Sequence, residues 1–524
     1  MQSPSKYPIG IQSFSEIRNN GYIYVDKTDY LRKLLELGSK YAFLSRPRRF
    51  GKSLFVSMTE EFFKGNRSLF KGLAIDNYGW EWFEHPVIHF DLSGCPSYSD
   101  DSMVEFIGDT LSRYEKDYGI TTDSSKQIGL RFKEIIIEAH RQTDMQVAIL
   151  IDEYDKPLLD SVDNQDRQEV YRQQLRSLYG NLKSQDNHIK FAMLTGVTKF
   201  GHLSIFSDLN NLEDISMTDD YSGICGITSD ELHEYFDNGV ENLAERLKIS
   251  KNEAYDLLRC NYDGYHFAPE NAPDIYNPFS IINALKNRRI SNYWFQTGTP
   301  SFLVKTIKNQ GISLQSLGDI DVDVDSIASI SFDFSSSLYP LLYQSGYLTI
   351  KGYRPEVNSV RLGFPNKEVE QGFYNQLMKV YIPAADRGTP FSILQFYDDI
   401  IEGNADSFMT RLQSLLSDFN QDGFSHIEIE QHYQDVIYLV MKLLGFFTHI
   451  EYKTASGRID LVVKTPKYIY VFEFKMNKTA REALEQIHSK DYLLPFKADG
   501  RRLVKIGANF SDKTHCFSDW IIEQ

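Results

Sequence analysis

The chain has 524 residues, and at roughly 150 residues per domain this length predicts about three to four domains. Hydrophobic residues make up 42%, charged residues 24% and aromatic residues 14%, a composition that excludes a largely disordered chain. The formal net charge of −16 excludes a histone-like coat protein for nucleic acids.

The first 225 residues show short apolar runs that alternate with helical patterns. The segment 22–37 is typical of a short strand followed by an amphipathic helix. Further strands are expected at 41–45, 87–92, 147–152 and 189–196, and helices after residue 52 and at 103–118 and 125–142. Strands that alternate with helices predict an α/β fold, in which a parallel sheet has helices on both faces.

The middle of the chain, 226–400, is expected to be mostly helical. Thr228 and Glu231 form a capping-box pattern at the start of a helix. Helices are predicted in 229–260, 279–288, 300–310, 337–345 and 368–419, and a hairpin in 352–366. The segment 313–335, rich in Ser and Asp, is expected to be an exposed loop.

The last part of the chain, 401–524, predicts a second and smaller α/β domain. A helix at 430–444 should lead into strands at 447–453, 458–464 and 468–475, followed by a helix at 479–491 and a strand at 502–509. Residues 430–524 hold 14 Lys/Arg and 12 Asp/Glu, against 42 and 60 in the remainder. This small domain therefore has a charge balance that permits approach to a phosphate backbone.

The chain shows no signal for a membrane or for secretion. No uncharged apolar stretch approaches the roughly 18 residues that cross a bilayer. The start, MQSPSKYPIGIQSF, has no basic region followed by an apolar one. The cysteines are scattered and fit no metal or redox spacing; they are Cys95, Cys225, Cys260 and Cys516. Reduced thiols in a cytoplasm are the simplest interpretation.

A candidate phosphate-binding loop, Arg46–Ser53, lies between a predicted strand and a predicted helix. Such a loop aims backbone N–H groups and the positive end of the helix dipole at a phosphate. Lys52 would reach the β- and γ-phosphates of ATP, and the Ser53 hydroxyl would bind Mg²⁺. Arg46 occupies the position where a glycine is usual. The alternative is a basic helix N-terminus that binds nothing.

Two acids, Asp152 and Glu153, end the apolar strand 148–151 about 100 residues after this loop. On a strand next to the loop, Asp152 would hold Mg²⁺ and Glu153 would polarise the attacking water. Two solvated acids at a strand end are the alternative. Thr195 and Thr198 either sense the γ-phosphate or are buried at a strand end. The predicted nucleotide-binding residues are Arg48, Arg49, Phe50, Gly51, Lys52, Ser53, Leu54 and Asp152.

A second candidate site lies near the C-terminus. Glu473 and Lys475 are two residues apart in an apolar strand and therefore face the same side. If the hairpin folds at 466–467, Asp460 lies opposite Glu473, and the two carboxylates repel unless a cation lies between them. Asp460, Glu473 and the Phe474 carbonyl would hold Mg²⁺.

This constellation predicts metal-assisted cleavage of a phosphodiester bond. Lys475 would position the nucleophile or neutralise developing charge. Gln486, on the following helix, would orient Lys475 or a water, and Glu430, on the preceding helix, would add a metal contact. The alternative is a surface hairpin with a Glu–Lys pair and an unrelated aspartate.

Along nearly its whole length, the sequence resembles the bacterial AAA-ATPase-like proteins with a C-terminal PD-(D/E)XK nuclease-superfamily domain. The matching segments are Tyr24–Thr28, Arg46–Ser53, Leu150–Asp155, Leu194–Val197, Phe206–Leu212, Tyr276–Ser280, Tyr293–Gly298, Gly457–Asp460, Phe472–Lys475 and Gln486–Ile487. The loop Pro47–Ser53 is the form that the phosphate loop takes in this family, so the missing first glycine fits the resemblance.

The resemblance implies a P-loop NTPase domain at 1–225, a mostly helical lid or linker at 226–400 and a restriction-endonuclease-like domain at 401–524. It implies ATP binding and hydrolysis coupled to a nuclease fold, with ATP and Mg²⁺ as cofactors and nucleic acid, DNA first, as the partner. Arg48 and Arg49 either stabilise charge in the transition state or are solvated. Assembly into a homo-oligomer is open, because an arginine can act in trans.

Three functions follow from these patterns. The first is an ATP-dependent nuclease with both sites active. The second is a nucleotide-switched binding module whose nuclease fold binds nucleic acid or protein without cutting. The third is an interaction protein with vestigial motifs. Metal binding that depends on Asp460 and Glu473 separates the first from the second, and nucleotide binding that depends on Lys52 separates both from the third.

Overall fold

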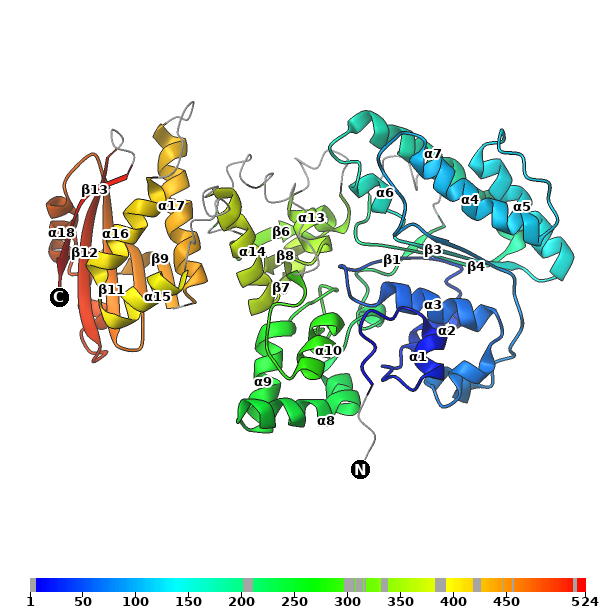
Figure 1. The fold of residues 1–524 in the computed structure, drawn as a ribbon, viewed down its shortest axis with the longest axis horizontal. Helices are drawn as coiled ribbons and strands as arrows, with labels where there is room; N and C mark the ends of the chain where they lie inside the picture. Colours follow the sequence, from blue (N-terminus) through cyan, green and yellow to red (C-terminus); the bar gives the residue numbers. More distant parts are fainter. Residues whose placement is uncertain are drawn as a thin grey trace. The chain divides into compact units, whose positions relative to one another are not determined.

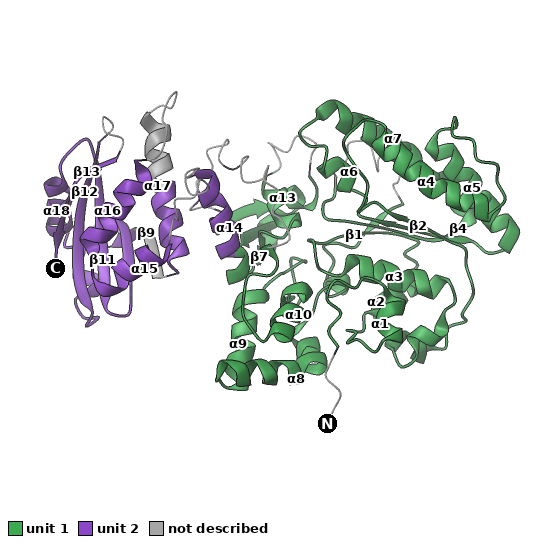
Figure 2. Ribbon diagram, viewed as in Figure 1, with its two compact units in different colours: residues 1–297, 319–369 green, residues 298–318, 370–524 purple. Residues whose placement is uncertain are grey.

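The structure of the chain is a computed structural model (Figure 1). It describes residues 6–200, 211–295, 307, 314, 317–330, 338–381, 393–417, 426–445, 447–454, 457–511 and 516–524, with the backbone alone at 426–434 and 447–451. The chain divides into two compact units, shown in Figure 2. Unit 1 comprises residues 1–297 and 319–369, and unit 2 comprises residues 298–318 and 370–524.

Unit 1 is built on a five-stranded parallel sheet with the order β2-β3-β4-β1-β5. Its strands are β1 Tyr41–Ser45, β2 Val87–Asp91, β3 Val147–Asp152, β4 Ile189–Gly196 and β5 Glu213–Asp214. Every residue of β3 is buried. A central parallel strand is covered on both faces, which explains its continuous apolar run.

Helices cover both faces of this sheet, as predicted (Figure 1). Helices α1, α2 and α3 lie on one face, and α4, α5 and α7 lie on the other. The bounds are α1 Phe14–Asn19, α2 Thr28–Glu36, α3 Lys52–Phe63, α4 Ser102–Asp117, α5 Ile128–Thr143, α6 Lys156–Leu159 and α7 Gln165–Ser184. The predicted α/β fold is therefore confirmed.

The strand order corrects one expectation. Asp152 was expected on the strand next to the phosphate loop, but β4 lies between β1, which leads into the loop, and β3, which ends at Asp152. The carboxyl ends of parallel strands still meet at one edge of the sheet. Thr195 lies near the end of β4, between the phosphate loop and Asp152, and donates its hydroxyl hydrogen to the Asp152 carboxylate.

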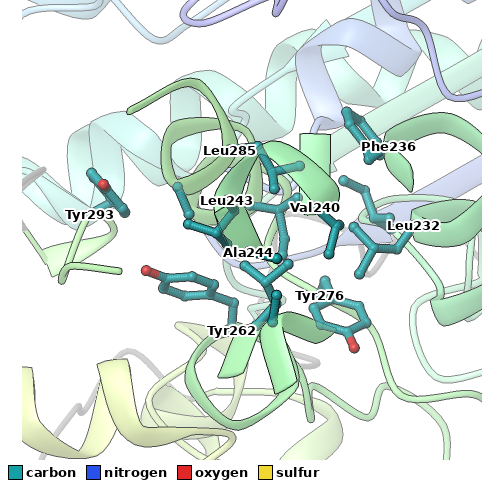
Figure 3. Close-up of a cluster of buried hydrophobic side chains, with 14 residues drawn as sticks. Leu232, Phe236, Val240, Leu243, Ala244, Tyr262, Tyr276, Leu285 and Tyr293 are labelled. Atoms are coloured by element: carbon teal, nitrogen blue, oxygen red, sulfur yellow. The ribbon is translucent and has the colours of Figure 1, made fainter. Parts of the chain in front are cut away.

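The helical middle region has its own hydrophobic core (Figure 3). Its helices are α8 Ser229–Leu247, α9 Lys251–Tyr262 and α10 Pro278–Asn287. Leu232, Val240 and Leu285 lie in this core. The predicted capping box of Thr228 and Glu231 starts α8. A second capping box at Ser250 starts α9, so the segment predicted as helical at 229–260 contains two helices.

Two local predictions in unit 1 are wrong. The segment 22–27 forms no strand; Tyr22 makes only an isolated bridge with Lys6. The expected loop at 313–335 contains β6 Ile320–Asp323 and α12 Val324–Ala328. β6 joins the predicted hairpin in a three-stranded sheet of order β6-β8-β7, with β7 Thr349–Arg354 and β8 Ser359–Gly363. Helix α13 spans Leu338–Gln344.

Unit 2 contains a five-stranded sheet of order β13-β12-β11-β10-β9. The strands are β9 Phe447–Thr454, β10 Gly457–Lys464, β11 Tyr468–Met476, β12 Arg502–Ser511 and β13 Cys516–Glu523. The helices are α14 Lys367–Tyr381, α15 Ile393–Glu402, α16 Ala405–Leu416, α17 His426–Leu443 and α18 Ala480–Ser489, of which α14 begins in unit 1. The last strand, β13, was not predicted; it pairs antiparallel with β12.

Within the described ranges, every helix is too short or too polar to cross a membrane.

Candidate functional sites

The phosphate loop connects the end of β1 to the first residue of α3, Lys52. Gly51, the N-cap, has φ +97°, and no side chain caps the helix. A Cβ added at Gly51 would meet open space, but the left-handed backbone favours glycine. The first N–H groups of a helix have no partner within the helix. The N–H groups of Lys52, Ser53 and Leu54 are therefore placed to receive an anion.

Lys52 is held inside the loop. Its side chain donates to the carbonyl oxygens of Arg46 at 2.8 Å and Pro47 at 3.1 Å, and the residue is only 5% exposed. Burial lowers the pKa of Lys52, while the negative charges of Asp152 and Glu153 oppose that shift. A move of Lys52 toward an incoming phosphate would break both bonds, so the phosphate would have to replace them.

Asp152 ends β3, and Glu153 follows it directly. Asp152 is 3% exposed and accepts a hydrogen bond from Thr195. Glu153 has φ +53°, a conformation that non-glycine residues adopt only at a cost. Burial raises the pKa of Glu153, and the charges of Lys52 and Arg48 oppose the shift. A carboxylate with a raised pKa is a better proton acceptor, which suits the role predicted for it.

A cavity of about 380 Å³ opens over the loop and is large enough for a small ligand. Its lining includes the predicted loop residues Arg48, Arg49, Phe50, Gly51, Lys52, Ser53 and Leu54, together with Glu153. Apolar side chains from the N-terminal segment and α10 complete the wall, namely Pro8, Ile9, Ile11, Pro278, Phe279 and Ile282. The predicted phosphate-binding residues and an apolar wall therefore share one cavity.

The loop arginines and Phe50 have distinct environments. Arg49 is exposed, and its guanidinium lies 5.0 Å from the centre of the Phe279 ring. Arg48 is half-buried, and its backbone carbonyl accepts from the Trp294 indole at 3.1 Å. The ring of Phe50 packs edge-on against Tyr265. The predicted contact of Phe50 with nucleotide would therefore be made by its backbone.

Arg46, at the usual glycine position, is a structural residue that the sequence did not reveal. It is 1% exposed and stacks on the Phe267 ring at 4.3 Å. Its guanidinium donates to the carbonyl oxygens of Ser216 at 2.6 Å and Tyr221 at 3.0 Å. These bonds fasten the loop to the segment 216–222, and backbone acceptors leave no trace in a sequence.

Two threonines, Thr195 in β4 and Thr198 just after it, donate hydrogen bonds to the acids. Asp155 is buried and accepts from the Thr198 backbone N–H and from the Thr198 hydroxyl, both at 2.7 Å. Thr195 holds Asp152 in the same way. Thr195 and Thr198 were predicted either to sense the γ-phosphate or to be buried at a strand end. Their burial and these contacts fit the second interpretation. Asp155 was not singled out from the sequence, although it lies three residues after Asp152.

In unit 2, the register of the hairpin brings Asp460 and Glu473 together. Leu461 pairs with Phe472 in the antiparallel ladder of β10 and β11, so the next residues along are Asp460 and Glu473. The Phe474 backbone N–H donates to Asp460 at 2.8 Å. Burial and the charge of Asp460 raise the pKa of Glu473 to about 7. The two carboxylates therefore repel, as the sequence predicts.

Glu473, Lys475 and Gln486 form one hydrogen-bonded cluster. Glu473 is 2% exposed, and its Oε1 accepts from Lys475 at 2.8 Å and also from Gln486. Lys475 donates to Gln486 Oε1 at 2.6 Å, so the predicted orienting role of Gln486 is met by a direct contact. Tyr492, which sequence patterns did not reveal, accepts a further bond from Gln486 at 3.3 Å.

The second oxygen of Glu473 lies outside this hydrogen-bonded cluster. Oε2 is buried and makes no hydrogen bond within the part of the chain that the structure describes. A buried carboxylate oxygen without a partner is costly, and a bound cation would remove that cost. The residues present thus fit Mg²⁺, which prefers oxygen ligands.

A third carboxylate near this pair is not established. Among the described side chains, no group of three or more His, Cys, Asp and Glu is close enough to hold a metal. Glu430 lies in α17, but its side chain is outside the described residues, so its metal contact stays a prediction. The same holds for Phe206–Asn210 and Gln296–Gly298 of the segments that resemble the family.

Comparison with protein families gives two matches. Residues 8–206 match the model of a predicted AAA-ATPase, and residues 428–520 match that of the PD-(D/E)XK nuclease superfamily. The first match covers the phosphate loop and both strand-end acids, and the second covers Asp460, Glu473, Lys475 and Gln486.

Relatives were found among curated proteins and solved structures. The uncharacterized protein in the vnfD 5′ region of Azotobacter chroococcum mcd 1 is 34% identical over 537 aligned positions, which cover 99% of each chain. The Aeropyrum pernix ORC1 protein in complex with DNA has a TM-score of 0.27 and 11% identity, over 68% of this chain and 93% of its own. Cdc6p from Pyrobaculum aerophilum has a TM-score of 0.21 and 10% identity, over 72% and 97%.

TM-scores this low support no inference on function. The full-length relative and the two family models do decide the family, because the relative is 34% identical over 99% of each chain. The chain belongs to the AAA-ATPase-like proteins that have a C-terminal PD-(D/E)XK nuclease-superfamily domain.

Proposed function

We propose that this protein binds and hydrolyses ATP, and that the ATP state controls a Mg²⁺-dependent nuclease domain that acts on nucleic acid. One observation supports the proposal most. Each unit holds a charged cluster in a partly buried place: Lys52 with Asp152 and Glu153 in unit 1, and Asp460 with Glu473, whose Oε2 accepts no hydrogen bond from the described residues, in unit 2.

In the ATPase half, the backbone N–H groups from Arg48 to Leu54 would receive the phosphates, and Lys52 would leave its two carbonyl acceptors to bind them. Ser53 and Asp152 would hold Mg²⁺. Glu153, with its raised pKa, would accept the proton of the attacking water.

In the nuclease half, Asp460, Glu473 and the Phe474 carbonyl would hold Mg²⁺, and Glu430 would add a contact. Bound there, the metal would neutralise charge on a phosphate and lower the pKa of a water. Lys475 is positioned by Glu473 and Gln486 and would hold the attacking water or neutralise the transition state.

The wider assignments belong to the same proposal. The NTPase domain would span 1–225, the helical lid or linker 226–400 and the nuclease domain 401–524. The substrate would be DNA, and the compartment would be the cytoplasm, since all four cysteines are free thiols. The chain would assemble into a homo-oligomer if an arginine of one copy acts on the nucleotide of a neighbouring copy.

The test is a paired assay of ATP hydrolysis and DNA cleavage on the full chain with Mg²⁺. We expect Lys52→Ala to lower ATP hydrolysis by about 100-fold or more, and Lys475→Ala to lower cleavage similarly while ATP hydrolysis continues. Matched controls are Lys64→Ala, at the other end of α3, and Lys490→Ala, after α18; both lysines are exposed and should leave both rates unchanged.

Two results would change the proposal. If ATP hydrolysis depends on Lys52 but no DNA is cut, and Lys475→Ala binds DNA as the wild type does, the nuclease fold is a binding module switched by nucleotide. If neither rate depends on these lysines, the motifs are vestigial.

A further inference from the structure

Trp294 and Glu368 connect the phosphate loop to the start of α14. The indole N–H of Trp294 donates to the Arg48 carbonyl at 3.1 Å. The backbone N–H of the same tryptophan donates to Glu368 Oε1 at 2.7 Å. Glu368 is the second residue of α14, so one tryptophan bridges the loop and this helix.

A second branch joins Glu368 to the cavity wall. The Ser280 hydroxyl donates to Glu368 Oε2 at 2.7 Å. Ser280 lies in α10, directly after Phe279, whose ring faces the Arg49 guanidinium and lines the cavity. Both oxygens of one carboxylate are thus bonded to segments that touch the phosphate loop.

This junction has little freedom to move. Glu368 is 1% exposed, and a buried carboxylate that loses its hydrogen bonds incurs a large cost. Trp294 packs edge-on against the Tyr347 ring, with centroids 5.3 Å apart. A shift of the Arg48 carbonyl must therefore move Trp294 and Glu368 together, or break buried bonds.

The helix that receives this contact continues into unit 2. Unit 1 includes Glu368 and Val369, and unit 2 begins again at Glu370 (Figure 2). The first turn of α14 is otherwise anchored by Asn366, whose side chain accepts from the Val369 N–H at 3.1 Å. This bond protects the Val369 N–H, so its exchange with solvent reports on the order of the first turn.

We propose that Trp294 and Glu368 are positioning residues that transmit the state of the phosphate loop to the first turn of α14, and from there along the chain to the nuclease domain. The inference rests on the proposed function, in which ATP binds that loop. Nucleotide would fix the Arg48 carbonyl, and the two bonds of Trp294 would carry that order to Glu368.

The experiment is hydrogen exchange of the full chain with and without a non-hydrolysable ATP analogue and Mg²⁺. Trp294→Phe removes the indole N–H and keeps a ring, and Glu368→Gln removes the charge and keeps the shape. The control is Trp520→Phe, which removes a matching indole bond, 2.8 Å to Asp406, in unit 2. The melting temperature of each protein reports whether nucleotide is bound.

The analogue should raise the melting temperature of all four proteins. In the wild type and in Trp520→Phe it should slow exchange in the first turn of α14 by about threefold or more, and in Trp294→Phe that slowing should vanish. Glu368→Gln should reduce the slowing of exchange in that turn. This variant tests the inference if Trp294→Phe fails to fold. Equal slowing in wild type and both variants, or none in a wild type that binds nucleotide, overturns this inference alone. A wild type whose melting temperature does not rise refutes the proposed function and the inference with it.

Discussion

Replacing Glu368 with glutamine should make unit 1 less sensitive to alkaline pH. Burial raises the pKa of this carboxyl from its ordinary value of 4.5 to about 7, although Ser280 and the Trp294 N–H stabilise its charged form. Glutamine can make both contacts without the charge, because its oxygen accepts from Trp294 and the Ser280 hydroxyl can reverse its role, but each bond is weaker than with the carboxylate. The variant therefore removes the titration and leaves the packing in place.

Proton linkage sets the direction in which pH changes the unfolding free energy. A raised pKa in the folded state favours folding of the protonated form, so the stability that Glu368 contributes is present below about pH 4.5 and is lost as pH rises through about 7. The shift corresponds to about 3 kcal/mol at full effect. Between pH 5 and pH 8.5, Glu368→Gln should gain about 2 to 3 kcal/mol in unfolding free energy relative to the unchanged protein.

Urea unfolding followed by tryptophan fluorescence measures this difference. In a Trp520→Phe background, the three remaining tryptophans, Trp80, Trp82 and Trp294, all belong to unit 1. Other titrating groups, including Asp263 with its pKa raised to about 6 by burial, cancel in the comparison of the two proteins. A difference between variant and parent that stays constant from pH 5 to pH 8.5 would refute the reasoning.

The remaining predictions concern stability. Thr228→Ala breaks the capping box with Glu231 at the start of α8, and urea unfolding should show a loss of about 1 kcal/mol. Gly129→Ala would bring a Cβ within 2.4 Å of the Ser177 carbonyl oxygen, so calorimetry should show a lower melting temperature and a loss of about 1 to 3 kcal/mol. Gly180→Ala, in the interior of α7 with open space around it, should stabilise by about 0.5 to 1 kcal/mol; a loss there would contradict this account of both glycines.

Much of the α/β core could be predicted from the sequence, because its strands are apolar runs that end in turn residues or acids. The bounds expected for β3 and β4 match those observed. The wrong strand at 22–27 shows what such patterns lack. Asp26 accepts from the Thr28 N–H at 2.9 Å and from the Ala74 N–H at 2.6 Å, and these side-chain bonds turn the segment toward α2 instead.

The strand β6 was missed because its acidic residues favoured a loop in the sequence. Its residues Ile320–Asp323 alternate apolar and acidic side chains, but their content of Asp favoured a loop. Asp321 lies 3.2 Å from Arg354 of β7, so the charge that argued against a strand has a partner about 30 residues later in the chain.

The candidate sites also contain residues that could be predicted from the sequence and residues that could not. Lys52, Asp152 and Glu153 could be predicted because they lie at the junctions of strands with loops and helices. Glu473 and Lys475 could be predicted because their spacing places them on one face of a strand. The supporting contacts of Arg46, Thr195 and Trp294 could not, since they depend on strand order and on backbone carbonyls far away in the sequence.

The most direct test of the account is a calorimetric titration of the full chain with Mg²⁺ in the absence of nucleotide, on wild type and Glu473→Gln. The buried Oε2 of Glu473 and the facing Asp460 predict that the wild type binds the ion and that the glutamine variant, which still folds, does not. Equal binding by both proteins, or no binding by the wild type, would contradict a metal site at this hairpin.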